Sequence, residues 1–225
     1  MSRFAAWAVP SLLLACAISA CGSTSGNGVA SKSANGIVSA ALGAIDGAKS
    51  AHISGTVLSA GTPVSLNLDL VSGQGGRGQM SQGGLGFRIE VVDNEVYING
   101  SPTFWHHFGG AAAEQLFQGK WLKAPASGQF TSLAQLSSLH TLVDTLLTTH
   151  GKLVRSGTSM VDGQSVVGVR DTTKDATLYV ATTGKPYPVE ILRTGSQAGR
   201  ITLNRFNEPV SLTPPSNAID ISKFK

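Results

Sequence analysis

Serine, histidine and aspartate are frequent enough in this chain to assemble a hydrolase triad on paper. The G-x-S-x-G motif, which presents a nucleophilic serine at a strand-to-helix turn, does not occur. The acidic residues Glu90, Asp93 and Glu95 lie across a strand end and a turn, and no two of them stand out as a general acid and base. We therefore expect that this protein is not an enzyme.

Two adjacent histidines, His106 and His107, are candidate metal ligands. In a helix their side chains point about 100° apart, so one ion could bind both only with distortion, and no H-x-x-x-H pattern lies nearby. We expect a surface pair beside an aromatic cluster, with no metal or other cofactor. His140 lies on the apolar side of a helical pattern, which favours a hydrogen-bonded core or cavity histidine over a catalytic one.

Three glycines, Gly73, Gly75 and Gly78, satisfy the G-x-G-x-x-G pattern of dinucleotide-binding sites. Such a site needs a helix directly after the glycines, to bind the pyrophosphate at its N-terminus. Here "QMSQGGLGFRIEV" continues into a strand. The pattern therefore predicts a glycine-rich hairpin or a mobile rim loop.

The setting of Cys21 indicates lipid attachment. Residues 1–20 carry one charge, Arg3, then the mostly apolar "AAWAVPSLLLACAI" and two small residues, a pattern typical of a signal peptide and not of a membrane span. The following "ISAC" resembles the lipobox of bacterial lipoproteins, in which the thiol receives a diacylglycerol and the chain is cut before the cysteine. The alternatives are a soluble secreted protein cut near Ala20, with Cys21 as a free or pairing thiol, and acylation of Cys16 in the less suitable "LLAC".

Lipidation at Cys21 would leave the mature chain without a free cysteine, which excludes disulfides and cysteine-based metal sites. We expect residues 1–20 to be a signal peptide, residues 21–35 a lipidated cysteine with a flexible tether, and residues 36–225 a single domain with a sizeable core. Removal of residues 1–20 lowers the net charge from +4 to +3. This bias is too small to indicate nucleic-acid binding.

Alternation of apolar and polar residues predicts strands in both halves of the domain. "VSLNLDL" is typical of a half-buried strand, and the alternation recurs in "FRIEV", "EVYING", "ATLYVA", "PVEIL" and "RITLNRF". Turn signals separate these runs at Asp93-Asn94, Asp162-Gly163, Gly184-Lys185-Pro186 and Gly195-Ser196. Strands with such short connections predict an antiparallel meander, in one highly curved sheet.

Helical spacing of apolar residues appears twice. Residues 37–49 form a short amphipathic pattern with Asn35 as a candidate cap. Residues 132–151 predict a longer helix, with Ser132 and Gln135 as a capping box and Gly151 as a stop. Before this helix, "SPTFWHHFGGAAAEQLFQGKWLKAP" concentrates aromatic residues. The predicted layout is a helix, one set of strands, a helical insert and a second set of strands.

This order resembles a known family. "DNEVYINGSPTFW", "GKWLKAP", an apolar helix, "ATLYVATTGKPYPVEI" and "GRITLNRFNEPVSLTPPSNAID" follow one another as in the LppX/LprAFG family of actinobacterial envelope lipoproteins, from about Ile37 onward. The resemblance implies an α+β fold like that of the LolA-type lipoprotein carriers. This fold is a half-open antiparallel β-barrel with helices covering its concave face around an apolar cavity. The resemblance also implies binding or transfer of lipids and lipoglycans.

The leading hypothesis is a membrane-anchored lipoprotein whose domain binds acyl chains in this cavity, with the polar head group at the mouth. The residues expected to line the cavity are Leu66, Leu68, Leu70, Phe87, Ile89, Val91, Ile98, Leu136, Leu139, Val143, Leu146, Leu178, Val180, Val189 and Ile191. Phe104, Trp105 and Phe108 are expected to form a gate or lid. A slip of one residue in a strand would exchange its two faces.

An ordinary filled core would produce the same alternation. The second hypothesis is therefore a non-catalytic envelope scaffold or regulator that binds a protein partner, and the third is hydrolysis of an envelope ester. The expected partners are a lipid or glycolipid ligand, the cell membrane through acylated Cys21, and an envelope transport protein. We expect an extracytoplasmic, lipid-anchored monomer that binds no nucleic acid.

Overall fold

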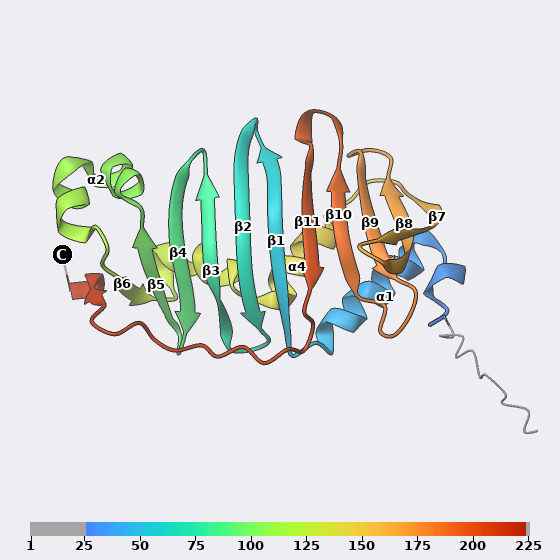
Figure 1. The fold of residues 1–225 in the computed structure, drawn as a ribbon, viewed down its shortest axis with the longest axis horizontal. Coiled ribbons are helices and arrows are strands. Elements are labelled where there is room, and N and C mark those ends of the chain that lie inside the picture. Colours follow the sequence, from blue (N-terminus) through green and yellow to red (C-terminus); the bar gives the residue numbers. More distant parts are fainter. Residues whose placement is uncertain (1–25, 224–225) are drawn as a thin grey trace, which may run out of the picture.

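A computed structural model describes residues 26–223, which form one sheet of twelve strands with helices packed on one side (Figure 1). The strands are β1 (Ser50–Ser59), β2 (Thr62–Val71), β3 (Gly75–Gln82), β4 (Leu85–Val92), β5 (Glu95–Gly100), β6 (Leu122–Pro125), β7 (Leu153–Val161), β8 (Gln164–Asp171), β9 (Ala176–Ala181), β10 (Pro188–Arg193), β11 (Gly199–Asn204) and β12 (Ile219–Asp220). The helices are α1 (Ala34–Asp46), α2 (Pro102–Phe117), α3 (Thr131–Leu136) and α4 (Leu139–Thr148), with 3₁₀ turns η1 (Val29–Ser31), η2 (Gly128–Phe130), η3 (Gly195–Gln197) and η4 (Ile221–Lys223).

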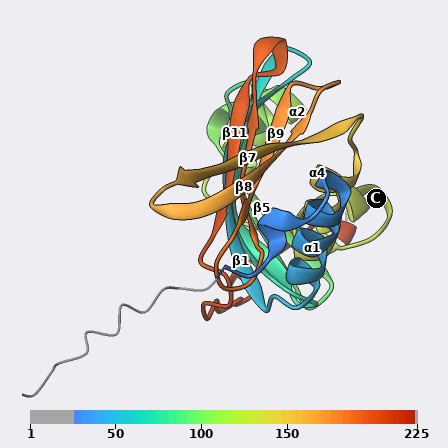
Figure 2. The ribbon, with the colours of Figure 1, turned by 90° about the vertical axis from the view of Figure 1, so that its right-hand side faces the viewer.

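The strands follow the order β12-β6-β5-β4-β3-β2-β1-β11-β10-β9-β8-β7. The two halves of the chain, β1–β6 and β7–β11, are thus joined in mid-sheet by the antiparallel pairing of β1 with β11. All pairs are antiparallel except the short parallel contact of β12 with β6. Helices α1 and α4 lie on the same side of the sheet (Figure 2). The prediction of one curved, unclosed sheet covered by helices is confirmed, with the correction that β12 makes it mixed.

The hairpins form where the sequence places its turn signals. Asp93 and Asn94 have φ angles of 54° and 61°, and Asp162 and Gly163 have 47° and 78°. Two such residues in succession give the turn whose twist matches that of the flanking strands. The glycine-rich segment is also a hairpin, because β3 begins at Gly75 and pairs with both β2 and β4. The prediction of a hairpin in place of a dinucleotide site is confirmed.

Six strands were not predicted, and two of these, β6 and β12, are only four and two residues long. β3 carries glycine at three positions and therefore shows little alternation. β7 lies at the edge of the sheet and is exposed at most positions, so it has no apolar face to reveal it. β8 contains a continuous apolar run, and β1 mixes small and polar residues.

The helices differ from the predictions at their ends. Ser33, and not Asn35, caps α1 by accepting a hydrogen bond from the backbone N–H of Gly36 at 3.2 Å. The predicted long helix is two helices, α3 and α4, and the Ser138 side chain caps the second by accepting from the N–H of Thr141 at 3.3 Å. The predicted capping box is wrong, because α3 follows η2 without a side-chain cap. α4 ends at Thr148, before Gly151.

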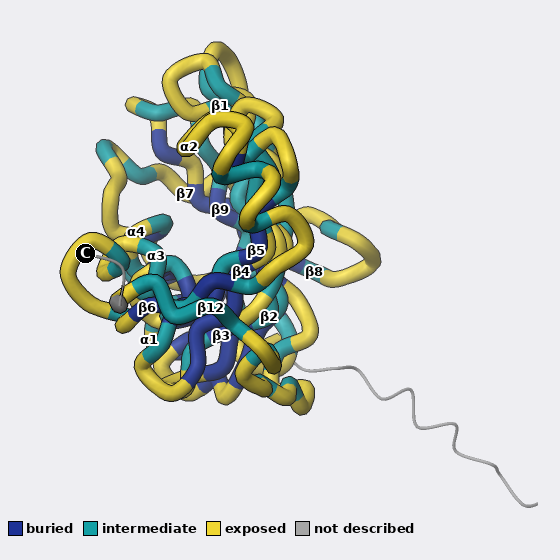
Figure 3. The backbone as a smooth tube through the Cα atoms, turned by 90° about the vertical axis from the view of Figure 1, so that its left-hand side faces the viewer, coloured by how far each residue is buried: buried dark blue, intermediate teal, exposed yellow. Residues whose placement is uncertain are grey.

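Helix α2 projects from one end of the sheet and is largely exposed, as the yellow tube in Figure 3 shows. His106 and His107 lie on its exposed surface, as predicted, and His106 contacts Glu114 at 2.9 Å. The prediction for His140 is wrong. This side chain is exposed and forms an ion pair with Asp46 at 2.7 Å. Within residues 26–223, no three His, Cys, Asp or Glu side chains meet as a metal site.

The chain packs onto the domain as early as Asn27. The Asn27 backbone N–H donates to the carbonyl oxygen of Thr182 at 2.8 Å, and its side-chain amide donates to the carbonyl oxygens of Ala181 and Gly184. Val29 is fully buried. The predicted flexible tether of residues 21–35 is therefore corrected, because its second half belongs to the folded domain.

After β11, the C-terminal segment runs along one end of the strands towards β6 (Figure 1). The backbone N–H of Thr213 donates to the buried carboxylate of Glu90 at 2.8 Å, which fixes the segment against β4. Among the helices of residues 26–223, none combines the length and the apolar character that crossing a bilayer requires.

Candidate functional site

A cavity of about 310 Å³ lies between the helices and one half of the sheet. Its apolar wall comes from α1, α4, β1, β2 and the strands β7–β11, through Val38, Val57, Leu66, Leu146, Leu147, Leu153, Val169, Ala176, Leu178, Ile191 and Ile201. Its polar rim consists of Thr145, Thr149, His150, Asp171, Lys174 and Arg193. The cavity thus combines an apolar interior with a charged and hydroxyl-bearing edge.

One row of the sheet forms the floor of the cavity. Neighbouring positions on β8, β9, β10 and β11 are occupied by Val169, Leu178, Ile191 and Ile201. Residues paired across antiparallel strands direct their side chains to the same face. The row continues through Gly55 on β1 to Leu66 on β2. Gly55 has a φ of 147°, and a Cβ there would collide with the Arg200 carbonyl oxygen, so only glycine fits.

Asp171 is the buried acidic group of the rim. Its carboxylate accepts hydrogen bonds from the backbone N–H groups of Gly151 and Thr173, both at 2.8 Å, and of Lys174 at 3.2 Å. Burial raises the pKa of this carboxyl, but the three N–H donors and the Lys174 charge outweigh burial and hold the pKa below its usual value. The ionised carboxylate therefore fixes the turn that carries Lys174.

Two cationic side chains stand at the rim. The Lys174 ammonium donates to the carbonyl oxygen of Thr149 at 2.9 Å, which holds it beside the end of α4. Arg193, at the end of β10, makes no side-chain hydrogen bond or ion pair within residues 26–223. A rim with a free guanidinium and a positioned ammonium suits an anionic group.

Two solved structures share this architecture. LprF from Mycobacterium bovis superposes with a TM-score of 0.54 at 16% identity, over 81% of this chain and 96% of that one. The Mycobacterium tuberculosis lipoprotein LppX superposes with a TM-score of 0.51 at 19% identity, over 80% of this chain and 98% of that one. This chain has the LprF and LppX fold. The fold implied by the resemblance to the LppX/LprAFG family is therefore confirmed, although no family model and no curated protein sequence matches the chain.

Within the LprF and LppX fold, the predicted lining residues separate into groups. Those that border the cavity are Leu66, Leu146, Leu178 and Ile191. Those that are buried in the hydrophobic core are Leu68, Leu70, Ile89, Val91, Leu139, Val143 and Val180. Those that are half-buried against this core are Phe87, Ile98 and Leu136. Val189 is half-buried on β10, at an irregularity in its pairing with β9.

The filled part of the core lies under α3. Leu68, Leu70 and Ile89 face Leu136 there, and the space between them is too small to hold a water molecule. The sheet is therefore covered in two ways. The β2–β4 region packs directly against α3, and the β8–β11 region is separated from α4 by the cavity.

The predicted gate does not border the cavity. Phe104, Trp105 and Phe108 belong to α2, at the opposite end of the sheet from β8–β10 (Figure 1). The Phe104 ring contacts those of Phe87, Trp105 and Phe108 at centroid distances of 5.3, 5.0 and 4.8 Å, and Phe108 is 66% exposed. These residues form an aromatic cluster that attaches α2 to β4. Cys21, the predicted lipid attachment site, lies outside the described residues.

Several cavity residues were missed by the sequence analysis. Ile201 lies in the recognised "RITLNRF" run and shares its alternation, so this pattern could have identified it. Val57, Leu153 and Val169 lie on strands that were not predicted. The rim residues come from turns and strand ends, and no periodic signal marks them.

Proposed function

We propose that this protein is a lipoprotein of the cell envelope, anchored through acylated Cys21, that binds a lipid acyl chain in the cavity and presents or carries it. The observation that supports the proposal is the apolar space between α4 and the β8–β11 floor, with polar groups only at its rim. Ligand sites are typically apolar pockets of about 300–1,000 Å³ with a few placed polar groups. At about 310 Å³, the cavity suits one chain and not several.

The energetics favour exchange with a membrane. Each methylene removed from water contributes about 0.8 kcal/mol, so a 14-carbon chain gains about 11 kcal/mol relative to water. The same chain gains almost nothing relative to the bilayer interior, because both environments are apolar. Transfer between membrane and cavity is therefore nearly neutral, and contacts to the head group decide its direction.

The rim indicates which head group these contacts favour. Lys174 and Arg193 supply two positive charges, and the single acidic group, Asp171, is already satisfied by three backbone donors. An acyl chain with a carboxylate or phosphate at its end would fill the apolar interior and place its charge beside these cations. We assign no catalytic step to the site. The protein's partners in this role are the lipid, the membrane and an envelope protein that exchanges lipid with it.

Native mass spectrometry of the full chain, produced in a host that supplies envelope lipids, tests the proposal. We expect a non-covalent adduct of one lipid, which is released on collisional activation and is thereby distinguished from acyl groups attached covalently to Cys21. This adduct should be lost in Leu146→Trp, because Leu146 borders the cavity, and retained in Thr148→Trp, which changes an exposed residue of the same helix. The same adduct on both variants would place the lipid outside this cavity, and its absence from the unmodified chain would instead favour a scaffold that binds a protein partner.

A further inference from the structure

The opposite face of the sheet carries a second hollow, on the side away from the cavity. Its volume is about 440 Å³, and it spans β2 to β5. Side chains alternate between the two faces of a strand. Leu66, Met80 and Phe87, which also border the hollow, pack their side chains against the core. The residues on either side of them, which face outward, form the walls. We call this hollow the outer trough.

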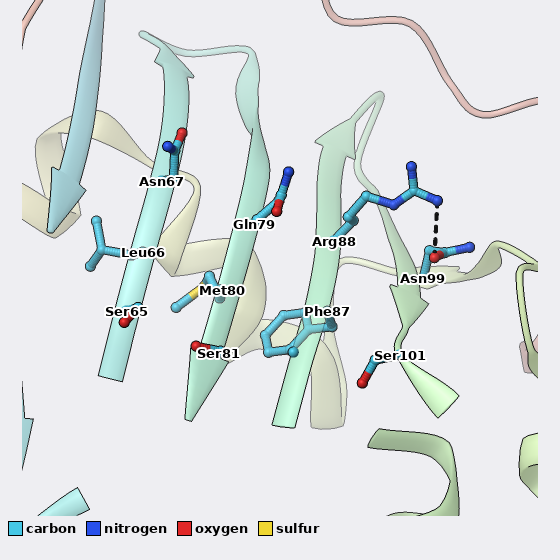
Figure 4. A pocket seen from close by; sticks show the side chains of 11 residues that line it. Ser65, Leu66, Asn67, Gln79, Met80, Ser81, Phe87, Arg88, Asn99 and Ser101 are labelled. Atoms are coloured by element: carbon cyan, nitrogen blue, oxygen red, sulfur yellow. Dashed lines mark hydrogen bonds between the residues drawn. The ribbon is translucent and has the colours of Figure 1, made fainter. Parts of the chain in front are cut away.

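One wall of the outer trough is a continuous row of polar side chains. Asn67, Gln79, Arg88 and Asn99 occupy paired positions on four neighbouring strands and lie side by side (Figure 4). The other wall contains Ser65 and Ser81, with Gly86 beside them. Because Gly86 has no side chain, the trough is open at that point. The nearest atom that a Cβ there would meet is the Ser81 Cβ, at 4.0 Å.

Part of this row is held in place and part is free. The Arg88 guanidinium donates to the Asn99 side-chain oxygen at 3.1 Å and lies over the Trp121 ring, 5.2 Å from its centroid. The Asn99 amide in turn donates to the carbonyl oxygen of Lys120 at 2.8 Å. Asn67 and Gln79 are exposed, and their amides have no hydrogen-bond partner within residues 26–223. The trough therefore offers free donors and acceptors beside a fixed guanidinium.

The chemistry of these groups selects a ligand class. The trough contains one cation and no acidic side chain, so it complements neither a polyanion nor a polycation. Apart from Arg88, its outward side chains are amides and hydroxyls, each of which both donates and accepts hydrogen bonds. Sugar hydroxyls do the same. The polar groups also repeat at the spacing of the strands, about 4.8 Å, which suits a ligand made of repeating units.

We infer that the outer trough binds a neutral oligosaccharide, which lies across β2 to β5 and hydrogen-bonds to Asn67, Gln79 and Arg88. This site is separate from the lipid cavity, because the two lie on opposite faces of the sheet. The C-terminal segment does not close the trough. It is fixed to β4 at Glu90, which lies two residues after Arg88 and therefore on the same face of the strand. A lipoprotein with this site would contact lipid with one face and glycan with the other.

A glycan array of uncharged hexose and pentose oligomers, probed with the full chain, tests the inference. We expect binding to at least one oligomer, with its affinity then measured by calorimetry. Asn67→Ala and Gln79→Ala should each weaken binding about fivefold, the effect of one hydrogen bond. Gly86→Leu should abolish it by filling the trough. Gln82→Ala, which removes an exposed amide of the same strand outside the trough, should bind normally.

A thermal melt of each variant establishes that it is folded. No binding to any neutral oligomer would overturn the inference, as would equal binding by Gly86→Leu. Glycan binding in the outer trough can also be distinguished from binding of a sugar head group at the lipid cavity. Ile191→Trp, which alters the cavity on the other face, should leave glycan affinity unchanged. Loss of glycan binding in that variant would assign the glycan to the lipid cavity and remove the outer trough as a site.

Discussion

Ile191→Trp provides a quantitative test of the cavity. Ile191 lies in the middle of the cavity floor, between Leu178 and Ile201, and an indole there would occupy the space above them. An unfilled apolar cavity costs about 24 cal/mol per Å³. For 310 Å³ this is about 7 kcal/mol, an upper value because the rim is open to water. A ligand that fills the cavity can recover part of this free energy. When the indole of Ile191→Trp already fills the cavity, a ligand has no such free energy to recover.

The assay is thermal unfolding of the full chain with and without palmitate. A ligand at 100 times its Kd stabilises the folded state by about 2.7 kcal/mol. For a domain of this size each kcal/mol raises Tm by about 2–4 °C, so the expected rise is about 5–11 °C. Ile191→Trp should show no rise. The matched control is Leu192→Trp, which changes the next residue of β10 on the other face and should respond like the unmodified chain. An equal rise in Ile191→Trp would refute a binding site at this cavity.

Three further predictions concern the rim and the core. Lys174→Ala and Arg193→Ala should each weaken palmitate binding about fivefold at low salt and leave hexadecanol binding unchanged. Displacement of a fluorescent fatty acid measures both affinities. Equal weakening of the binding of both ligands would exclude a head-group contact. Because the pKa of Asp171 is lowered in the folded state, its contribution is complete above the unfolded pKa of about 3.9 and is lost as pH falls through the folded value. Asp171→Asn should therefore lower the free energy of unfolding at pH 7 by about 1.5–3 kcal/mol and flatten its decline below pH 4 in urea titrations; an unchanged decline would show that another group causes it. Leu139→Ala should cost about 2–5 kcal/mol of stability because Leu139 is fully buried, and Phe108→Ala, on the exposed surface, should stay within about 0.5 kcal/mol; similar losses in the two would contradict the assigned burial.

Local patterns in the sequence predict much of the fold. "VSLNLDL" alternates because one side of β2 faces the core and the other faces water. Asp93 and Asn94 predict a tight hairpin because both adopt positive φ angles. β7 has no such signal, because an edge strand that is exposed on both faces has no apolar side.

The division between core and cavity has no sequence signal. Leu66 and Leu68 are the same residue type on the same face of β2, yet one borders the cavity and the other is fully packed. The difference arises from the helix above each. Because the helix is interrupted after Leu136, α3 packs directly on the sheet, whereas the cavity separates α4 from β8–β11. A periodic pattern records which face is apolar, but it does not record how far away the covering helix lies.

If Cys21 is acylated, as proposed, the attachment of Asn27 to the end of β9 limits how far the domain can move from the membrane. β9 also carries Leu178 of the cavity floor, so the cavity and the start of the folded chain belong to the same end of the molecule. With Cys21 as the anchor, the five residues up to Gly26 reach at most about 18 Å. This is less than the thickness of the hydrocarbon core of a bilayer, about 30 Å. A domain on so short a connection diffuses in two dimensions and samples only its own membrane, and a lipid bound for a distant acceptor would have to be handed to a second protein.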